Sequence, residues 1–521
     1  MIKSHRFSLI AIACLVVILS VVRSLYHVDP LHFGLMLSNA HDLFIGKRPY
    51  QEIFIQYGLL TTTLHAAALW VSERLLSLMV ITAIFYSAGL LLIYFIAFKV
   101  TSNENLSLAV LLIAFLFHPV AIYPWANYMA FPFLMGAIYF LVNPIIHLAP
   151  ARGHALLAGA FLGLATLCRD GLILTVACLI IGNFAVGWIA QPKLLKQKFI
   201  ELGLLLLGLA TPLLLFFGYL FASGLESYWF LLSVALPKIN ATHHFTAMSS
   251  WGFMNRFWET VFLGSLRLDF RWILVLIMAA INIFICACFA LRIQKNYVSE
   301  STVKLALFSL ALFSSALHLT EIFRIATGSI VGLIPALIFI NSKGWLKSFV
   351  VGACITLGVT LIWRNDSLMF YPNTDVLRKA GYASSPAIFT GQLWNAPNTQ
   401  YYQEVDETFS NLKKLDDCKL QYHYNSTGDA FIATLSPFKA YQISPFANDP
   451  HVDALRPDLN YQQKIAEAKD IVVLKMIPLD EVAGFSPPPG FYTFKQITVP
   501  DIHYIPSKHM LMVMVPQICK P

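Results

Sequence analysis

Three histidines, two aspartates and a glutamate stand in one loop of this chain, "HVDPLHFGLMLSNAHDLFIGKRPYQEIFIQYG", residues 27–58. The loop follows a strongly apolar N-terminal stretch. An aspartate held at a membrane surface can serve as general base for a substrate hydroxyl, which is a poor nucleophile at neutral pH. Asp29 is one residue that could act in this way, and His32, Glu52 and Tyr57 are candidates for binding substrate.

Asp29 also has a structural explanation that requires no catalysis. An aspartate followed by proline suits the N-cap and first turn of a helix. The spacing of apolar residues predicts an amphipathic helix on the membrane surface, which Gly46 would end and Pro49 would keep from restarting. Its apolar face would carry Phe33, Met36, Leu37, Ala40 and Phe44. Both roles stay open, because a capping carboxylate can also act as a base.

The composition places the protein in a bilayer. Of its 521 residues, 57% are hydrophobic and 12% charged, with a mean hydropathy of +0.66. Soluble domains carry about 25% charged residues. The net charge of +8 does not indicate nucleic-acid binding, since lysine and arginine gather in the cytoplasmic loops of polytopic proteins.

Apolar runs predict about 11–12 transmembrane helices, because about 20 apolar residues suffice to cross a membrane. The first would be an uncleaved span with its N-terminus inside. Residues 58–72 are apolar but short and are expected to lie in the interface. The predicted spans are 8–24, 78–98, 105–121, 127–147, 154–168, 171–190, 199–222, 271–291, 304–320, 325–340 and 345–363.

Short basic stretches fix the expected orientation. Residues 191–198, 292–304 and 341–347 are basic and are placed in the cytoplasm. The first loop, residues 118–127, Arg169 and the tail after residue 363 then fall outside.

The tail, residues 364–521, is polar and has no run long enough to span. One segment (400–415) is typical of a helix, and three (470–477, 491–499 and 509–515) are typical of strands. We expect a transmembrane domain over residues 1–363 and a small extracytoplasmic α/β domain over 364–521. Its two cysteines, Cys418 and Cys519, could form one disulfide or remain as buried thiols.

The first loop resembles that of the GT-C glycosyltransferases, polytopic enzymes that include protein mannosyltransferases and aminoarabinose transferases and use polyprenyl-phosphate sugar donors. "LLAGAFLGLATLCRDG", residues 156–171, is similar to a second segment of that group. The resemblance is clearest over residues 25–190 and does not extend to the tail. The matching loop positions are Asp29, Ala40, Leu43, Gly46, Pro49, Tyr50, Glu52, Tyr57, Gly58 and Leu59.

The resemblance implies that Asp29 is the general base for the acceptor hydroxyl. It also implies a basic residue near Arg324 for the donor phosphate; a guanidinium is well suited to this contact. Relatives often carry a second acid in the next external loop, but residues 117–132 contain none. The family's usual proline is replaced by Leu59.

Several other side chains have two possible roles. Arg324 and Arg169 could contact phosphate or form local ion pairs with Glu321 and Asp170. Asn127, with its neighbours His118, Trp125 and Tyr128, could contact sugar or belong to an interfacial aromatic belt. His27, Asp29 and His32 are a weak metal set. The site is therefore predicted without a metal, although some GT-C members use a divalent cation.

These patterns predict an integral-membrane glycosyltransferase of the bacterial inner (plasma) membrane. It would move one sugar from a polyprenyl-phosphate carrier to a cell-envelope glycan, lipid or protein on the outer face. The alternatives are a polysaccharide polymerase or ligase, which would tolerate loss of the first-loop acid, and a lipid-linked glycan transporter or flippase. A transporter would show internal repeats, and none is evident in the sequence.

Overall fold

The computed structural model describes most of the chain. The described residues are 2–25, 29–55, 57–118, 122–142, 151–236, 269–293, 297–316, 322–363, 381–382, 386–415, 418–442, 465, 467–501 and 508–520. The predicted domain boundary between residues 363 and 364 lies at the edge of a stretch outside this set.

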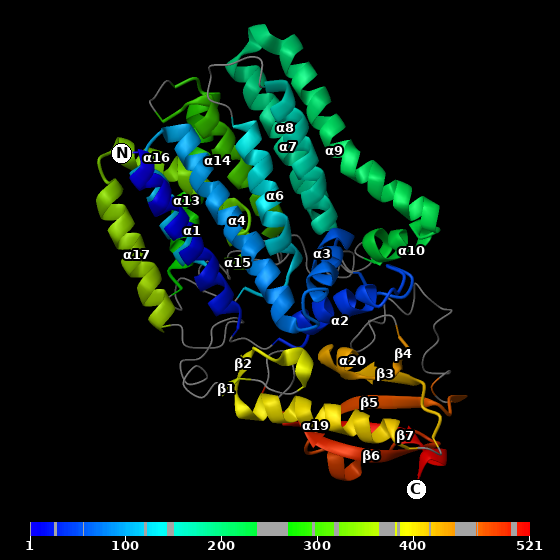
Figure 1. The fold of residues 1–521 in the computed structure, drawn as a ribbon. Helices are drawn as coiled ribbons and strands as arrows, with labels where there is room; N and C mark the ends of the chain where they lie inside the picture. Colours follow the sequence, from blue (N-terminus) through cyan, green and yellow to red (C-terminus); the bar gives the residue numbers. More distant parts are fainter. Residues whose placement is uncertain are drawn as a thin grey trace.

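The chain is a polytopic helical membrane protein with a C-terminal α/β domain (Figure 1). Four described helical segments are long and apolar enough to cross a bilayer: Leu75–Thr101, Asp170–Ala190, Pro192–Ser223 and Arg271–Ala290. Seven shorter apolar helices accompany them. The helices of this part are α1 (Ile2–Ser24), α4 (Leu75–Thr101), α5 (Glu104–Phe117), α6 (Ala126–Leu141), α7 (Ala151–Cys168), α8 (Ile173–Ala190), α9 (Leu195–Ser223), α10 (Glu226–Phe230), α13 (Arg271–Ala290), α14 (Glu300–Leu312), α15 (Ile322–Ala326), α16 (Leu333–Ser342) and α17 (Leu346–Trp363).

The predicted spans 304–320 and 325–340 are not continuous helices. Helix α14 ends at Leu312, and α16 begins only at Leu333. Between them the described residues form short 3-10 turns and the five-residue α15. Polar residues and Gly328 interrupt the apolar run here, which weakens a regular helix.

The two ends of the helical bundle differ as the basic stretches predict. Figure 1 shows the start of α1 and the α8–α9, α13–α14 and α16–α17 junctions at the end opposite the C-terminal domain. The end of α7 and the start of α6 lie at the end that faces this domain. The predicted outer segments therefore share one side with the tail.

Helices α7 and α9 cross closely because of small residues. A Cβ on Gly159 would overlap the Leu205 carbonyl, and one on Gly208 would overlap the Leu156 carbonyl. Gly159 and Gly163 form the small-xxx-small spacing that lets membrane helices approach. The segment that resembles the GT-C group thus has a packing role in this chain.

Two short helices lie between the bundle and the C-terminal domain: α2 (His32–Phe44) and α3 (Leu59–Leu69). Helix α2 ends where predicted, with Gly46 in the left-handed region at φ +89°. Its residues from Phe33 to Ala40 are buried on all sides, so it is covered and does not lie on an open membrane surface. Helix α3 rises about 16 Å, half of what a span needs, which agrees with the interfacial expectation.

The C-terminal domain is a mixed sheet with the order β4-β3-β5-β7-β6. Strand β3 pairs in parallel with β4 and β5, whereas β7 pairs antiparallel with β5 and β6. The predicted helix and three strands are confirmed as α19, β5, β6 and β7. The elements are β1 (Gly381–Tyr382), β2 (Leu393–Trp394), α19 (Ala396–Lys413), β3 (Tyr422–Ser426), α20 (Phe431–Leu435), β4 (Lys439–Ala440), β5 (Ile471–Pro478), β6 (Phe491–Thr498) and β7 (His509–Pro516).

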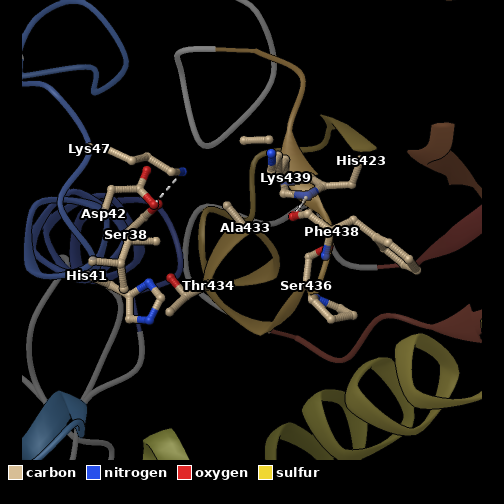
Figure 2. A pocket seen from close by; sticks show the side chains of 13 residues that line it. Ser38, His41, Asp42, Lys47, His423, Ala433, Thr434, Ser436, Phe438 and Lys439 are labelled. Atoms are coloured by element: carbon tan, nitrogen blue, oxygen red, sulfur yellow. Dashed lines mark hydrogen bonds and ion pairs between the residues drawn. The ribbon is translucent and has the colours of Figure 1, made fainter. Parts of the chain in front are cut away.

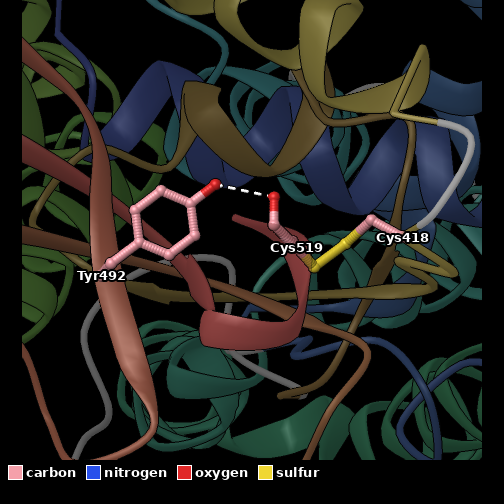
Figure 3. Close-up of a disulfide and its surroundings, with 3 residues drawn as sticks. All are labelled: Cys418, Tyr492 and Cys519. Carbon is pink, nitrogen blue, oxygen red and sulfur yellow. Dashed lines mark hydrogen bonds between the residues drawn. A yellow bond between two sulfur atoms is a disulfide. The ribbon is translucent and has the colours of Figure 1, made fainter. Parts of the chain in front are cut away.

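Cys418 and Cys519 form a disulfide, with their Cα atoms 5.0 Å apart (Figure 3). The bond ties the segment after α19 to the end of the chain, across 101 residues. The Tyr492 hydroxyl donates a 2.8 Å hydrogen bond to the Cys519 carbonyl from the neighbouring strand. Of the two sequence alternatives for these cysteines, the disulfide is the one present.

The C-terminal domain is joined to the first loop by backbone contacts. The Ala430 N–H donates to the Pro30 carbonyl at 3.1 Å, and the Leu393 N–H donates to the Leu25 carbonyl at 2.9 Å. Gly34 of α2 lies against α20, where an added Cβ would come within 2.7 Å of the Phe431 nitrogen. The domain therefore packs directly on the segment that carries Asp29.

Candidate functional site

Asp29 and His32 form a hydrogen-bonded pair at the start of α2. One carboxylate oxygen accepts the His32 backbone N–H at 2.8 Å, which is the capping contact, and the other lies 2.6 Å from His32 Nδ1. The Asp29 side chain is fully buried, whereas that of His32 is 20% exposed. Both roles weighed for Asp29 are thus compatible in one geometry, and the imidazole is the more accessible partner.

Aromatic rings from the next outer segment surround His32. The Trp125 ring meets it edge-on at 4.5 Å, and Tyr123 lies at 6.1 Å. The Tyr57 ring lies 4.4 Å from the Trp125 ring. Aromatic faces of this kind can pack on a sugar ring or a prenyl chain. We call His32, Tyr57, Tyr123 and Trp125 the aromatic wall.

Arg324 lies beside the aromatic wall. Its guanidinium carbon is 5.2 Å from the centre of the Phe323 ring, and Phe323 in turn meets Tyr123 at 5.4 Å. Arg324 is buried, with only 6% of its surface exposed. Glu321, the ion-pair partner that the sequence offered, lies outside the described residues.

Arg169 approaches from the end of α7. The Cys168 carbonyl accepts the Gly58 N–H at 3.1 Å and the Thr61 hydroxyl at 2.8 Å. These bonds fix Arg169, which is 6% exposed, next to the Tyr57–Gly58 end of the first loop. The structure therefore brings both candidate arginines to the region of Asp29 and His32, although 155 residues separate them in sequence (324 − 169).

Other predicted residues are placed differently. Glu52 is exposed, and its carboxylate accepts the Arg48 N–H at 2.7 Å within its own turn, so it is not brought to Asp29. Asn127 is buried at the start of α6, and its Oδ1 has no hydrogen-bond partner among the described residues. His118 is fully buried and bonded to the Tyr128 hydroxyl at 2.6 Å, which favours an internal role for both.

The basic pair of the first loop makes contacts within the protein. The Lys47 ammonium pairs with Asp42 at 2.6 Å, and the Arg48 guanidinium donates to the Ser223 carbonyl at 2.6 Å. Both side chains are thus engaged by groups of the protein itself. Of the weak metal set, His27 lies outside the described residues, and no three His, Cys, Asp or Glu side chains cluster for a metal in the part that is described.

Two features of the site had no signal in the sequence. Tyr123 and Phe323 complete the aromatic surroundings of His32, but they lie in segments about 200 residues apart. Asp429 of the C-terminal domain precedes Ala430, whose N–H bonds to the residue after Asp29. Asp429 is fully buried, and burial raises its pKa to about 7.

Comparisons with known proteins bear on the fold. No protein-family model matches the sequence, and no curated protein matches it. The structure is similar to crystal structures of ArnT from Cupriavidus metallidurans. For the form bound to undecaprenyl phosphate, the TM-score is 0.56 at 12% identity, covering 100% of both chains. For the apo form, the TM-score is 0.57 at 13% identity, covering 100% of this chain and 99% of the other.

An Archaeoglobus fulgidus oligosaccharyltransferase matches more loosely, with a TM-score of 0.44 at 14% identity over 89% of this chain and 67% of that one. ArnT is an aminoarabinose transferase of the GT-C group. At such low identity the likeness establishes architecture, from the first span to the C-terminal sheet. The chain shares the fold of ArnT along its whole length, which agrees with the resemblance of its first loop to the GT-C glycosyltransferases.

Proposed function

We propose that this protein is an integral-membrane glycosyltransferase that moves a sugar from a polyprenyl-phosphate donor to a cell-envelope acceptor on the extracytoplasmic face. The observation that carries the proposal is the Asp29–His32 pair, set among aromatic rings, with the buried Arg324 and Arg169 on segments that contact the same rings or the same loop. ArnT, which has the same fold, has been crystallised with undecaprenyl phosphate. That complex supports a lipid-linked donor for this chain.

Asp29 and His32 act together as the base in this proposal. A neutral imidazole that donates its Nδ1–H to a carboxylate keeps a lone pair on Nε2. The acceptor hydroxyl gives its proton to the imidazole while its oxygen bonds to the anomeric carbon of the donor. The carbon–oxygen bond to phosphate breaks, and its electron pair leaves with the polyprenyl phosphate. Asp29 orients the ring and stabilises the imidazolium that forms.

The two arginines act on the leaving group. Negative charge concentrates on the phosphate oxygens as the sugar departs, and guanidinium groups in a site screened from water stabilise such charge strongly. Arg324 is proposed to contact the phosphate, with Arg169 assisting it. Tyr57 and Trp125 would hold the sugar or the first prenyl units against their rings.

The disulfide and the basic stretches bear on how the protein is oriented in its membrane. A disulfide persists in oxidising compartments, which supports an extracytoplasmic C-terminal domain. The basic stretches at the other end of the bundle support a cytoplasmic position for that end. The membrane would be the bacterial inner membrane, so that donor and acceptor meet at its outer face.

The test is mass spectrometry of envelope glycans and glycolipids from a deletion strain. The strain is complemented with wild type, Asp29→Asn or His32→Gln at equal protein levels. We expect loss of one sugar from an envelope component, restored by wild type alone. Asparagine caps a helix about as well as aspartate, so failure of Asp29→Asn would report on chemistry. Restoration by both variants would contradict the proposed base and favour the transporter or polymerase alternatives.

A further inference from the structure

A pocket of about 300 Å³ lies where the first loop meets the C-terminal domain (Figure 2). This volume is at the lower end of the range for ligand sites. One wall comes from α2 and the turn after it, and the other comes from α20 and the edge of the sheet. The polar residues that line it are Ser38, His41, Asp42, Lys47, His423, Thr434, Ser436 and Lys439.

We propose that this pocket binds one sugar unit of a glycan acceptor. The inference rests on the proposed function and narrows it, because it selects a glycan among the three acceptor classes. The pocket is separate from the aromatic wall. His41 lies nine residues beyond His32 on α2, or about 13 Å along the helix. One oligosaccharide chain can place a sugar in the pocket and present another unit at His32.

His423 gives the pocket a hydrogen-bond acceptor. Its Nδ1 lies 3.0 Å from the Phe438 carbonyl, which can only accept, so Nδ1 carries the hydrogen (Figure 2). Burial lowers the pKa of His423 to about 4, so the ring is neutral at neutral pH. Its Nε2 therefore carries a lone pair, and this atom has no hydrogen-bond partner within the described residues. A hydroxyl can donate to such an atom, whereas an anion without a bound hydrogen cannot.

The pocket is lined by one carboxylate and two ammonium groups, and the carboxylate pairs with one of them. The Lys47 ammonium is bound to the Asp42 carboxylate at 2.6 Å, as the dashed line in Figure 2 marks. Burial also lowers the pKa of His41, which favours its neutral form. Lys439 adds one exposed ammonium. An anionic ligand would meet the Asp42 carboxylate and gain little from a lysine that is already paired.

A polyhydroxylated ring satisfies this lining better. Its hydroxyl groups can donate to Asp42 and His423 and accept from Lys439. The Thr434 hydroxyl, buried and without a partner among the described residues, can do either. The Phe438 ring points away from the pocket toward Phe409 of α19 (Figure 2). Ile45 and Pro437 supply the apolar surface for the carbon face of the sugar. Mixed donors and acceptors beside apolar side chains are thus matched by a neutral sugar.

The test measures sugar binding without any donor. The full-length protein in lipid nanodiscs is titrated with methyl glycosides of hexoses and N-acetylhexosamines, followed by saturation-transfer NMR. Inorganic phosphate serves as the anionic comparison. We expect at least one methyl glycoside to bind saturably in the millimolar range. Affinity should fall at least fivefold in Lys439→Ala and in Ala433→Leu, which fills the pocket.

Lys495→Ala is the matched control, since this lysine is also exposed on an edge strand of the same sheet. It should bind as wild type does, and equal thermal unfolding of all variants shows that they fold. Absence of glycoside binding, binding unaffected by both pocket variants, or saturable binding of phosphate alone would each overturn the inference. Transfer to a non-glycan acceptor that both pocket variants leave unchanged would overturn it while the transferase stands. Pocket-dependent sugar binding by a protein without transferase activity would support the pocket and refute the proposed function.

Discussion

The carboxylate of Asp29 and the imidazole of His32 lie 2.6 Å apart, with the aspartate fully buried and the histidine partly exposed. In the proposed mechanism, this relationship divides one catalytic task between two residues. The exposed ring can meet a substrate hydroxyl, whereas the buried carboxylate acts through that ring and through the cap of α2. It predicts that both side chains are needed for transfer, for different reasons.

His32→Gln removes the proton acceptor and keeps a hydrogen-bonding side chain. We expect the transfer rate to fall by about 10² or more, with little change in thermal stability. Asp29→Asn should lower the rate comparably, since asparagine retains the cap but cannot stabilise the imidazolium. Rates are compared in membranes at matched protein levels. Normal transfer by His32→Gln together with none by Asp29→Asn would mean that Asp29 takes the proton directly.

Arg324 is expected to act on the departing phosphate. Arg324→Gln should lower kcat by about 10²–10³, as for loss of one donor to a developing oxyanion, and should change the KM for the acceptor little. Arg324→Lys should recover part of the loss, because it restores charge without the guanidinium fork. Steady-state kinetics with varied acceptor provide the measurement. An increase in the acceptor KM alone would place Arg324 in the acceptor site instead.

Local features of this protein could be predicted from sequence because they depend on neighbouring residues. Gly46 ends α2 where a left-handed residue is required, and strands β5 and β7 of the tail coincide with short apolar runs. The long apolar segments are helices. The broken helices around Gly328 were harder to predict, because an apolar run reads as one span even where short turns interrupt it.

The full set of site residues could be identified only from the structure, because these residues come from distant segments of the chain. Asp29 and His32 are three residues apart, whereas tertiary packing brings Trp125 against His32 and Ala430 against Pro30. It also brings Phe323 against Tyr123. Burial was also hidden in the sequence. The amphipathic pattern of α2 predicted a helix with one face in lipid, whereas α3 and the C-terminal domain cover it.

Gly34 should be essential for seating the C-terminal domain. In Gly34→Ala the new methyl group would meet the backbone of Ala430 and Phe431, so α2 and α20 must separate. We expect a loss of about 1–3 kcal/mol in the free energy of unfolding, together with faster limited proteolysis of the tail. Gly218→Ala in α9 is the control, because a Cβ there meets open space. Equal behaviour of the two variants would contradict the close packing.

The Cys418–Cys519 disulfide should stabilise the tail substantially. It closes a loop of 101 residues, and long loops lose much chain entropy when they are cross-linked. The double variant Cys418→Ser, Cys519→Ser should lose about 2–4 kcal/mol, measured by unfolding of the full-length protein. Cys14→Ser is the control, since Cys14 is a free, exposed thiol. No difference from that control would mean that the bond contributes little to stability.

Asp429 should make the stability of the seam between the C-terminal domain and the first loop depend on pH. Burial raises its folded-state pKa to about 7, despite the opposing effects of the Phe431 N–H and the hydroxyls of Tyr401 and Tyr402. Asp29 lies across the same seam, and its charge, like that of Asp429, raises the pKa of Tyr402. Below pH 3.8, the ordinary value, Asp429 is protonated in both the folded and the unfolded states.

Between pH 3.8 and about 7 the unfolded chain loses this proton while the folded protein keeps it. The contribution of Asp429 to stability is therefore lost as pH rises through this window, and the loss is complete above it. Asp429→Asn removes the ionisation, so the variant should gain stability relative to wild type between pH 5 and pH 8. Thermal unfolding at both pH values measures this change, with the exposed Asp501→Asn as control. A difference between variant and wild type that is the same at pH 5 and pH 8 would show that Asp429 does not titrate in this range.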